Sequence, residues 1–483
     1  MSTQRVHQIF DRETAAFEAA NPRSRELYER ARGSLLGGVP MSWMMKWAGG
    51  FPLFAASAEG STITDVDGHA YADFCLGDTG AMTGHAPAAV ADTLAEQAAR
   101  ALTTMLPSPD APVVGEALRE RFGLPLWQMT LSATDANRFA IRFGREITGR
   151  PRILIFNWCY HGSVDETFAT LRDGRVVARE GNVGPPVDPG RTTRVVEFND
   201  VAALEAALAE GDVACVLAEP AMTNIGIVLP DPGFHDALRA LTRRYGTLLI
   251  IDETHTLSTG YGGYTREHGI EPDLLTVGKP IGGGVPAGAF GMTQEVAERA
   301  LAQPDADYVD TGGVGGTLAG NALSLAAMRA ALTEVLTQES YARTIPLAER
   351  FEAGVQVAIE RHGAPWHVTR LGSRVEYAFT PEQPRTGGEA AAAHDDELES
   401  LLHLYALNRG VLMTPFHNMA LMGPTTTKEQ VDLHTSVFSE ALDELFGGPE
   451  PGTGQYRGRG DLYGKGEGDG RHGREQGAAG RAA

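Results

Sequence analysis

Short runs of apolar residues alternate with amphipathic segments through the middle of this chain. Four of the runs are continuous and rich in Val, Ile and Leu: residues 152–156, 213–217, 247–251 and 274–277. Segments between them, such as residues 234–245, carry apolar side chains at helical spacing. Apolar strands that alternate with helices are typical of a mostly parallel sheet covered on both faces. The pattern therefore predicts a large α/β domain from residue 76 to residue 331.

The segments on either side of this domain predict a smaller α+β domain. Residues 12–31 have the spacing of a helix, and residues 61–74 that of a β-hairpin that turns at Asp67-Gly68. Further along, the pattern predicts a helix, a strand and two more helices at residues 341–362, 373–379, 396–408 and 428–446. We expect residues 1–75 to contribute to this smaller domain and residues 332–447 to form the rest. Residues 448–483 are rich in Gly and charge and poor in apolar residues, which predicts a disordered tail.

Bulk composition narrows the classes of function. The 483 residues allow about two to four domains. The formal net charge of -21 argues against nucleic acid or an anionic membrane as the main partner. Cys75, Cys159 and Cys215 are too widely spaced for a disulfide framework or a paired metal site. Because the chain also has no signal-like N-terminus and no apolar stretch of spanning length, we expect a cytoplasmic protein that acts on small molecules.

The most informative feature is a lysine in a glycine-rich turn. Lys279 follows the apolar run 274–277, and Asp252 follows another apolar run. In a parallel sheet the carboxyl ends of the strands meet at one edge, so Lys279, Asp252 and Glu219 are predicted to face one crevice. A lysine amine there can form a Schiff base with the aldehyde of pyridoxal phosphate (PLP), and a buried carboxylate can keep the pyridine nitrogen protonated. This pair predicts a PLP enzyme.

Two other chemistries fit the motifs poorly. The glycines around residues 282–284 are not followed by Lys-Ser or Lys-Thr and do not form the G-x-G-x-x-G that opens a dinucleotide-binding helix. The histidines, among them His85, His161, His255 and His268, lack the H-E-x-x-H spacing of metal hydrolases. We therefore expect neither a nucleotide site nor a metal site.

From residue 37 to residue 446 the chain resembles the class III, fold type I PLP-dependent aminotransferases, and among them enzymes similar to glutamate-1-semialdehyde aminomutase. The segment 131–137 resembles the family's phosphate-binding turn, Tyr160-His-Gly its ring-stacking motif, and Asp252-Glu-Thr its Asp-Glu-Val. The resemblance implies a large domain with a smaller one, a homodimer with shared active sites, and N-terminal residues 1–75 at the dimer interface. It implies these cofactor-binding residues: Ser132, Ala133, Thr134, Tyr160, Glu219, Asn224, Asp252, Lys279 and Thr317, the last acting on the neighbouring subunit's phosphate.

The resemblance leaves the substrate open. Candidate substrate-binding residues are Arg374, which could pair with a carboxylate, together with Trp43, Lys46 and His417. We expect an aminotransferase that moves an amino group from an amino acid, β-amino acids included, or another primary amine to a keto acid. Met419 stands about where the aminomutase has a glutamate, and residues 43–47 where it has an arginine, so an aminomutase is the alternative. A non-catalytic binding protein with a PLP fold is a further alternative, which the intact Lys279–Asp252 pair opposes.

Overall fold

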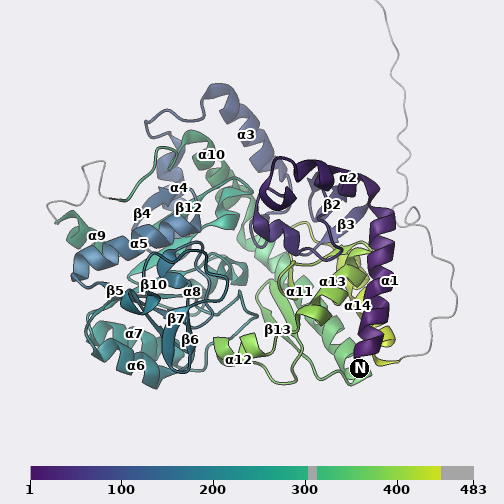
Figure 1. Cartoon of the computed structure of the whole chain (residues 1–483). Coiled ribbons are helices and arrows are strands. Elements are labelled where there is room, and N and C mark those ends of the chain that lie inside the picture. Colours follow the sequence, from purple (N-terminus) through teal and green to yellow (C-terminus); the bar gives the residue numbers. More distant parts are fainter. Residues whose placement is uncertain (1, 303–312, 448–483) are drawn as a thin grey trace, which may run out of the picture. The chain divides into compact units, whose positions relative to one another are not determined.

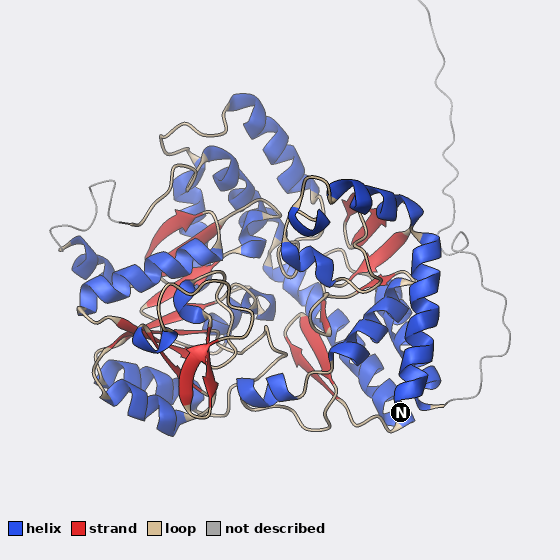
Figure 2. Ribbon diagram, viewed as in Figure 1, coloured by secondary structure: helices blue, strands red, loops and turns tan. Residues whose placement is uncertain are grey.

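The computed structural model describes residues 2–302 and 313–447. Its largest sheet has seven strands in the order β4-β12-β11-β10-β9-β5-β8 (Figures 1 and 2). All neighbouring strands pair in parallel except at β12, which is antiparallel to both β11 and β4. The strands are β4 (Leu126–Thr130), β5 (Arg152–Phe156), β8 (Thr193–Val196), β9 (Val213–Ala218), β10 (Leu248–Asp252), β11 (Leu274–Val277) and β12 (Gly288–Met292). The mostly parallel α/β sheet predicted from the apolar runs is confirmed.

Helices between the strands bury the faces of this sheet. α5 (Ala133–Thr148) packs across β4, β9, β11 and β12, and α7 (Phe234–Arg244) packs against β10. The central strands are fully buried along their length, as the uninterrupted apolar runs predicted. The other helices of this part are α3 (Ala88–Arg100), α4 (Asp110–Phe122), α6 (Val201–Ala209), α8 (Gly263–Glu267), α9 (Gln294–Leu301) and α10 (Ala322–Ala330). A two-stranded hairpin, β6 (Ala169–Arg172) and β7 (Arg175–Ala178), forms a separate sheet that contacts β8.

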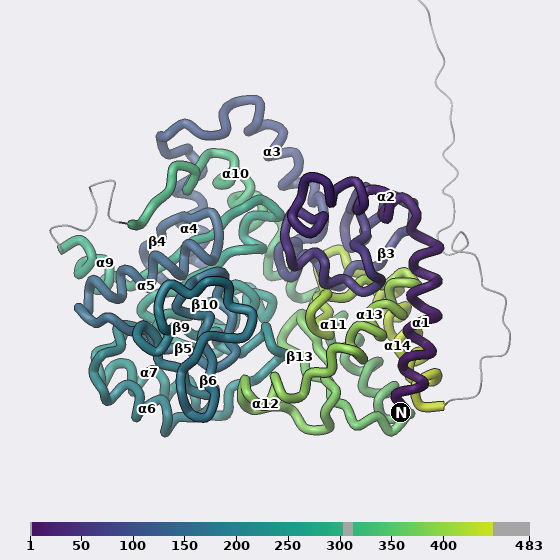
Figure 3. Tube along the Cα trace, viewed as in Figure 1, coloured from purple at the N-terminus to yellow at the C-terminus, as the bar shows by residue number. Residues whose placement is uncertain are grey.

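Two small sheets, β1-β2-β3-β15 and β13-β14-β16, lie outside the large one, and the first of them joins the two ends of the chain. β3 (Ala70–Asp73) pairs with β15 (Val411–Leu412), so the N-terminal hairpin joins the C-terminal part, as the tube trace also shows (Figure 3). The remaining strands are β1 (Ala55–Glu59), β2 (Thr62–Asp65), β13 (His367–Leu371), β14 (Arg374–Ala378) and β16 (Met419–Leu421). Around them lie α11 (Gln338–His362), α12 (Gly387–Ala392), α13 (Asp396–Leu407) and α14 (Lys428–Phe446). The domain boundaries at 75/76 and 331/332 stay predictions.

The first helix differs from its prediction. The single helix expected over residues 12–31 is two helices, α1 (Thr3–Ala20) and α2 (Pro22–Ala31). Pro22 has no N–H to donate to the preceding turn, and its ring would clash with that turn, so it ends one helix and begins the next. The predicted tail, residues 448–483, lies outside the described residues. Within the part of the chain that the structure describes, no helix is both long and apolar enough to cross a membrane.

Candidate active site

A cavity of about 610 Å³ opens where β10 and β11 end. This is the edge of the sheet at which the sequence placed the chemistry. Six of the predicted site residues line the cavity: Ser132, Ala133, Thr134, Tyr160, Asp252 and Lys279. Thr254 and His255, which follow Asp252, also contribute to its wall. The structure therefore brings the predicted lysine, carboxylate, phosphate turn and aromatic ring to one open cavity.

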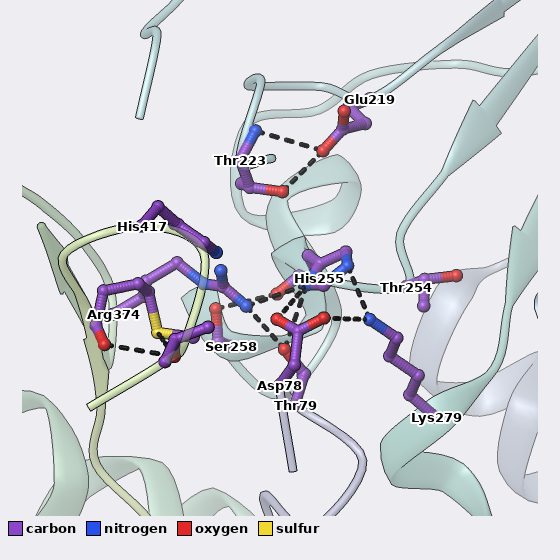
Figure 4. A network of polar contacts seen from close by, with 12 residues as sticks. Asp78, Thr79, Glu219, Thr223, Thr254, His255, Ser258, Lys279, Arg374 and His417 are labelled. Atoms are coloured by element: carbon purple, nitrogen blue, oxygen red, sulfur yellow. Dashed lines mark hydrogen bonds and ion pairs between the residues drawn. The ribbon is translucent and has the colours of Figure 1, made fainter. Parts of the chain in front are cut away.

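The amine of Lys279 contacts two side chains that come from different segments. Its Nζ lies 2.7 Å from Asp78 Oδ2 and 2.8 Å from His255 Nε2 (Figure 4). Burial raises the pKa of Asp78, but the nearby Lys279, His255 and Arg374 outweigh this effect and hold it well below its usual range. Burial lowers the pKa of His255 well below its usual value, so the ring is neutral. Lys279 thus lies between a carboxylate and a neutral imidazole.

Asp78 reaches the lysine from a strained turn. Four consecutive residues have positive φ: Leu76 at 42°, Gly77 at 59°, Asp78 at 49° and Thr79 at 78°. Only glycine adopts this region freely, and each other residue costs about 1–2 kcal/mol there. Strain of this kind persists when the surroundings enforce it, and it clusters at functional sites. The turn therefore marks Asp78 and Thr79 as candidate functional residues.

Asp252 is held by three hydrogen-bond donors at the floor of the cavity. Its Oδ2 lies 2.8 Å from the donating Nδ2 of Asn137 and 2.9 Å from His161 Nδ1, and its Oδ1 accepts from the Thr254 N–H at 3.0 Å. Burial raises the pKa of Asp252, but the hydrogen bond and charge of His161 outweigh this effect and lower it. Burial likewise lowers the pKa of His161, but Cys159 and Asp252 outweigh it and raise it. Asp252 is therefore an ionised carboxylate in a buried ion pair.

The predicted phosphate turn, residues 132–134, begins α5 (Ala133–Thr148), whose first N–H groups have no partner within the helix. Three glycines close around this turn. A Cβ added at Gly162, Gly278 or Gly288 would lie 2.0, 2.8 or 2.5 Å from one of its atoms, closer than real Cβ atoms approach other atoms. The turn is therefore clamped in place with its N–H groups at a helix N-terminus, an arrangement suited to a phosphate.

These features fit the cofactor that the sequence resemblance implies. The helix N-terminus and its glycine cradle suit the phosphate of PLP, and ionised Asp252 suits a protonated ring nitrogen. The ring of Tyr160, 36% exposed, borders the same cavity. The residues present therefore fit PLP: residues 132–134 would hold its phosphate, Asp252 its ring nitrogen, and Lys279 would supply the amine for its aldehyde.

Three predicted cofactor residues lie away from the cavity wall. Glu219 is buried and accepts hydrogen bonds from the N–H and hydroxyl of Thr223, and burial raises its pKa (Figure 4). Asn224 follows on the same loop and is half-buried. Thr317 is exposed on the segment that precedes α10. Their roles toward a cofactor stay predictions.

Of the four candidate substrate-binding residues, two are buried and two lie beside Phe416. Arg374 is fully buried, and its Nη2 donates to Thr79 Oγ1 and to His255 Nδ1, 2.9 Å away. His417 is buried against Glu376 Oε1 at 2.8 Å; burial lowers its pKa, but Glu376 outweighs this and raises it. Trp43 and Lys46 both contact Phe416, with a centroid separation of 6.4 Å for Trp43 and 5.6 Å from Lys46 Nζ. None of the four borders the described cavity.

Sequence reasoning assigned no role to five residues that contact this machinery: Asp78, Thr79, Asn137, His161 and His255. Two of them had a local signal, because His161 belongs to the Tyr-His-Gly motif and His255 follows Asp252 by three positions. Asp78 stands between glycines in Gly77-Asp-Thr-Gly80, which indicates a turn but not its neighbours. Their contacts depend on how distant segments pack.

Known proteins resemble this chain in sequence and in fold. A model of the aminotransferase class-III family matches residues 44–442. A glutamate-1-semialdehyde aminomutase of Pseudomonas aeruginosa, solved in complex with PMP, is 51% identical with a TM-score of 0.90, over 92% of this chain and 99% of that one. The glutamate-1-semialdehyde 2,1-aminomutase of Sorangium cellulosum is 35% identical over 430 residues, 87% of this chain and 96% of that protein. A β-phenylalanine aminotransferase of Variovorax paradoxus is 27% identical with a TM-score of 0.80, over 90% of this chain and 97% of that one.

Proposed function

This chain belongs to the class III aminotransferases, which are PLP-dependent enzymes, and from that premise we propose that it is an aminomutase that moves an amino group within one small amino-carbonyl substrate. The observation that carries the proposal is the 51% identity to a glutamate-1-semialdehyde aminomutase over 99% of that protein's chain. The curated aminomutase of Sorangium cellulosum supports it at 35% identity. The substrate we propose is of the same class, a short chain that carries an amino group beside an aldehyde.

The side chains of the cavity divide the work. Lys279 provides the amine that anchors the cofactor and, once released, carries a proton to and from the substrate carbon. When bound, PLP supplies an electron sink for the charge that develops at that carbon. Asp252, kept ionised by His161, holds the proton on the ring nitrogen. Residues 132–134 would hold the phosphate, and Tyr160, which borders the same cavity, would stack on the ring.

Transfer between two molecules is the second candidate. The observation that favours it is Met419, which is fully buried on β16, at about the position where the resemblance to the aminomutase implies a glutamate. A transferase releases a carbonyl product after the first half-reaction, and the amino group stays in the site until a second, carbonyl substrate takes it up and leaves as an amine. A mutase needs no second substrate.

One experiment separates the two. The PLP-loaded enzyme is incubated with a panel of amino acids, β-amino acids and amino aldehydes, without any keto acid. A mutase converts its substrate to the isomer over many turnovers, whereas a transferase stops after one equivalent of ketone and aminated cofactor. Lys279→Ala should abolish both and remove the visible absorbance of the lysine-bound cofactor, while exposed Lys428→Ala should preserve both. Stoichiometric release of ketone with no isomer would refute the mutase.

We also propose that the active sites are shared between two copies of the chain, with exposed Thr317 of one copy acting on the phosphate of the other. A mixture of Lys279→Ala and Thr317→Val subunits tests this. At limiting PLP each parent is impaired, and a mixed dimer has one site with both residues intact. Recovery of activity on mixing supports the shared site, and its absence, with mixed dimers demonstrated by native mass spectrometry, contradicts it.

A further inference from the structure

The imidazole of His255 connects a buried arginine to the reactive lysine. Arg374 Nη2 lies 2.9 Å from His255 Nδ1, and His255 Nε2 lies 2.8 Å from Lys279 Nζ. One ring nitrogen therefore faces the guanidinium and the other faces the lysine nitrogen (Figure 4). Thr79 Oγ1 lies 3.0 Å from Nδ1 and also accepts from Arg374. All three ring neighbours come from different segments of the chain.

The arginine fixes where the ring proton lies. A guanidinium has only donors, so the 2.9 Å contact with Arg374 requires Nδ1 to be the acceptor. A neutral imidazole carries one proton, which must then be on Nε2 and point at Lys279. The 2.8 Å contact with Nζ is a hydrogen bond only while that nitrogen has its lone pair. The arrangement therefore fits the free amine of Lys279, with one of its own N–H groups donated to Asp78.

We propose that His255, with its tautomer set by Arg374, stabilises the free-amine form of Lys279, the form that attacks the cofactor aldehyde and accepts the substrate proton. The inference rests on the proposed function for the role of Lys279. It makes His255 a catalytic residue, since it touches the reacting nitrogen, and makes Arg374 a positioning residue that acts through the imidazole. The carboxylate of Asp78, 2.7 Å away, accepts an N–H of the same nitrogen and holds it beside the ring.

Burial and charge support this arrangement. The ionisable groups that face the ring are Lys279, Asp78, Arg374 and Asp252. Arg374 is 0% exposed, and its Nε and Nη1 have no partner among the described residues. A buried cation with two unpaired donors costs stability. We attribute the presence of Arg374 at this position to its Nη2, which contacts both His255 and Thr79.

The test measures the lysine directly in the cofactor-free protein. Competitive acetylation by acetic anhydride, followed by peptide mass spectrometry, gives the reactivity of Lys279 relative to exposed Lys428 at each pH. We expect His255→Leu to lower the labelling of Lys279 about tenfold at pH 7.5, the effect of losing about one hydrogen bond to the amine. His255→Gln keeps an amide N–H that can reach Nζ, so its labelling should stay within about threefold of the wild type. Arg374→Met should lower labelling as His255→Leu does.

His434, a buried histidine of α14 that stacks on Phe351, provides the matched control. His434→Gln should leave the labelling of Lys279 unchanged. Equal losses in His255→Gln and His255→Leu, or labelling of His255→Leu within twofold of the wild type at pH 7.5, would overturn the proposal. Because the readout needs neither cofactor nor substrate, its result is independent of the amine panel. In the loaded enzyme, His255→Leu should lower kcat with little change in KM, whereas a mere packing defect would change both.

Discussion

The ion pair of His161 and Asp252 allows a prediction about stability and pH. Replacing His161 by Leu leaves Asp252 ionised in a site where its side chain is only 4% exposed. Breaking one partner of a buried pair costs about 3–5 kcal/mol, because the remaining charge stays buried. Asp252 keeps the donors of Asn137 and Thr254, and His161 Nε2 has no partner among the described residues. For both reasons we expect the free energy of unfolding to fall by about 3 kcal/mol, the lower end of that range.

The directions of the two pKa shifts set the pH window. The pKa of His161 is raised, so its contribution is complete below the unfolded value of about 6.5 and is lost as pH rises toward the folded one. The pKa of Asp252 is lowered, so its contribution is complete above about 3.9 and is lost in more acidic solution. The difference between wild type and His161→Leu should therefore be largest between about pH 4 and 6.5 and shrink above it.

Urea unfolding of the cofactor-free protein, followed by circular dichroism from pH 5 to 9, measures this difference. His161→Asn keeps a neutral donor near Nδ1 and should lose less stability than His161→Leu. His434→Leu is the control: burial lowers the pKa of His434 to about 3, so its contribution should not change between pH 6.5 and 9. A loss under 1 kcal/mol at pH 6 for His161→Leu, or a loss that does not shrink by pH 9, would refute the ion pair.

Three further predictions concern the phosphate turn, the buried carboxylate of Asp252 and the buried ion pair of Glu13 with Arg409. Gly288→Ala puts a Cβ 2.5 Å from the Ser132 carbonyl group, so it should displace the phosphate turn and weaken PLP binding at least tenfold by fluorescence titration; unchanged affinity would contradict the clamp. Asp252→Asn should keep bound PLP but lose at least a hundredfold in the half-reaction measured by stopped-flow absorbance, since no anion then holds the ring proton; near-normal rates would count against that role. Glu13, 1% exposed and paired with Arg409, has a lowered pKa because that arginine outweighs burial, so Glu13→Gln should cost about 2–4 kcal/mol at pH 7 and progressively less below pH 4 in urea unfolding.

Local pattern was enough to predict the large sheet. Mainly apolar runs such as residues 152–156 and 274–277 match β5 and β11, because a strand buried on both faces carries apolar side chains on both. The closing helix predicted over residues 428–446 coincides with α14, where the Thr427 capping box fixes its start and Gly447 its end. The division of residues 12–31 into two helices was missed, because helical spacing continues through Pro22 although the backbone hydrogen bonds do not.

The part of the candidate site that lies at the ends of the strands could be predicted from the sequence. Lys279 and Asp252 each follow an apolar run, and the carboxyl ends of β10 and β11 meet at one edge, so their proximity follows from the sheet alone. The pairing of Arg374 with a substrate carboxylate stays a prediction, whereas its contact with His255 was not predictable from the sequence. A residue on a short strand has a predictable face but no predictable partner, because its partner belongs to another segment.

By itself the sequence determined the layered α/β architecture, the edge of the sheet that carries the chemistry, and the lysine and carboxylate at that edge. These are consequences of backbone periodicity and strand direction, which are written into neighbouring residues. Only the tertiary structure decided which groups surround the lysine nitrogen. Arg374 and Thr79 are 295 positions apart in the chain, and they meet at His255 because a strained turn and a small-domain strand pack against the end of β10. Contacts of that kind depend on packing between distant segments, and they set the protonation of the groups that react.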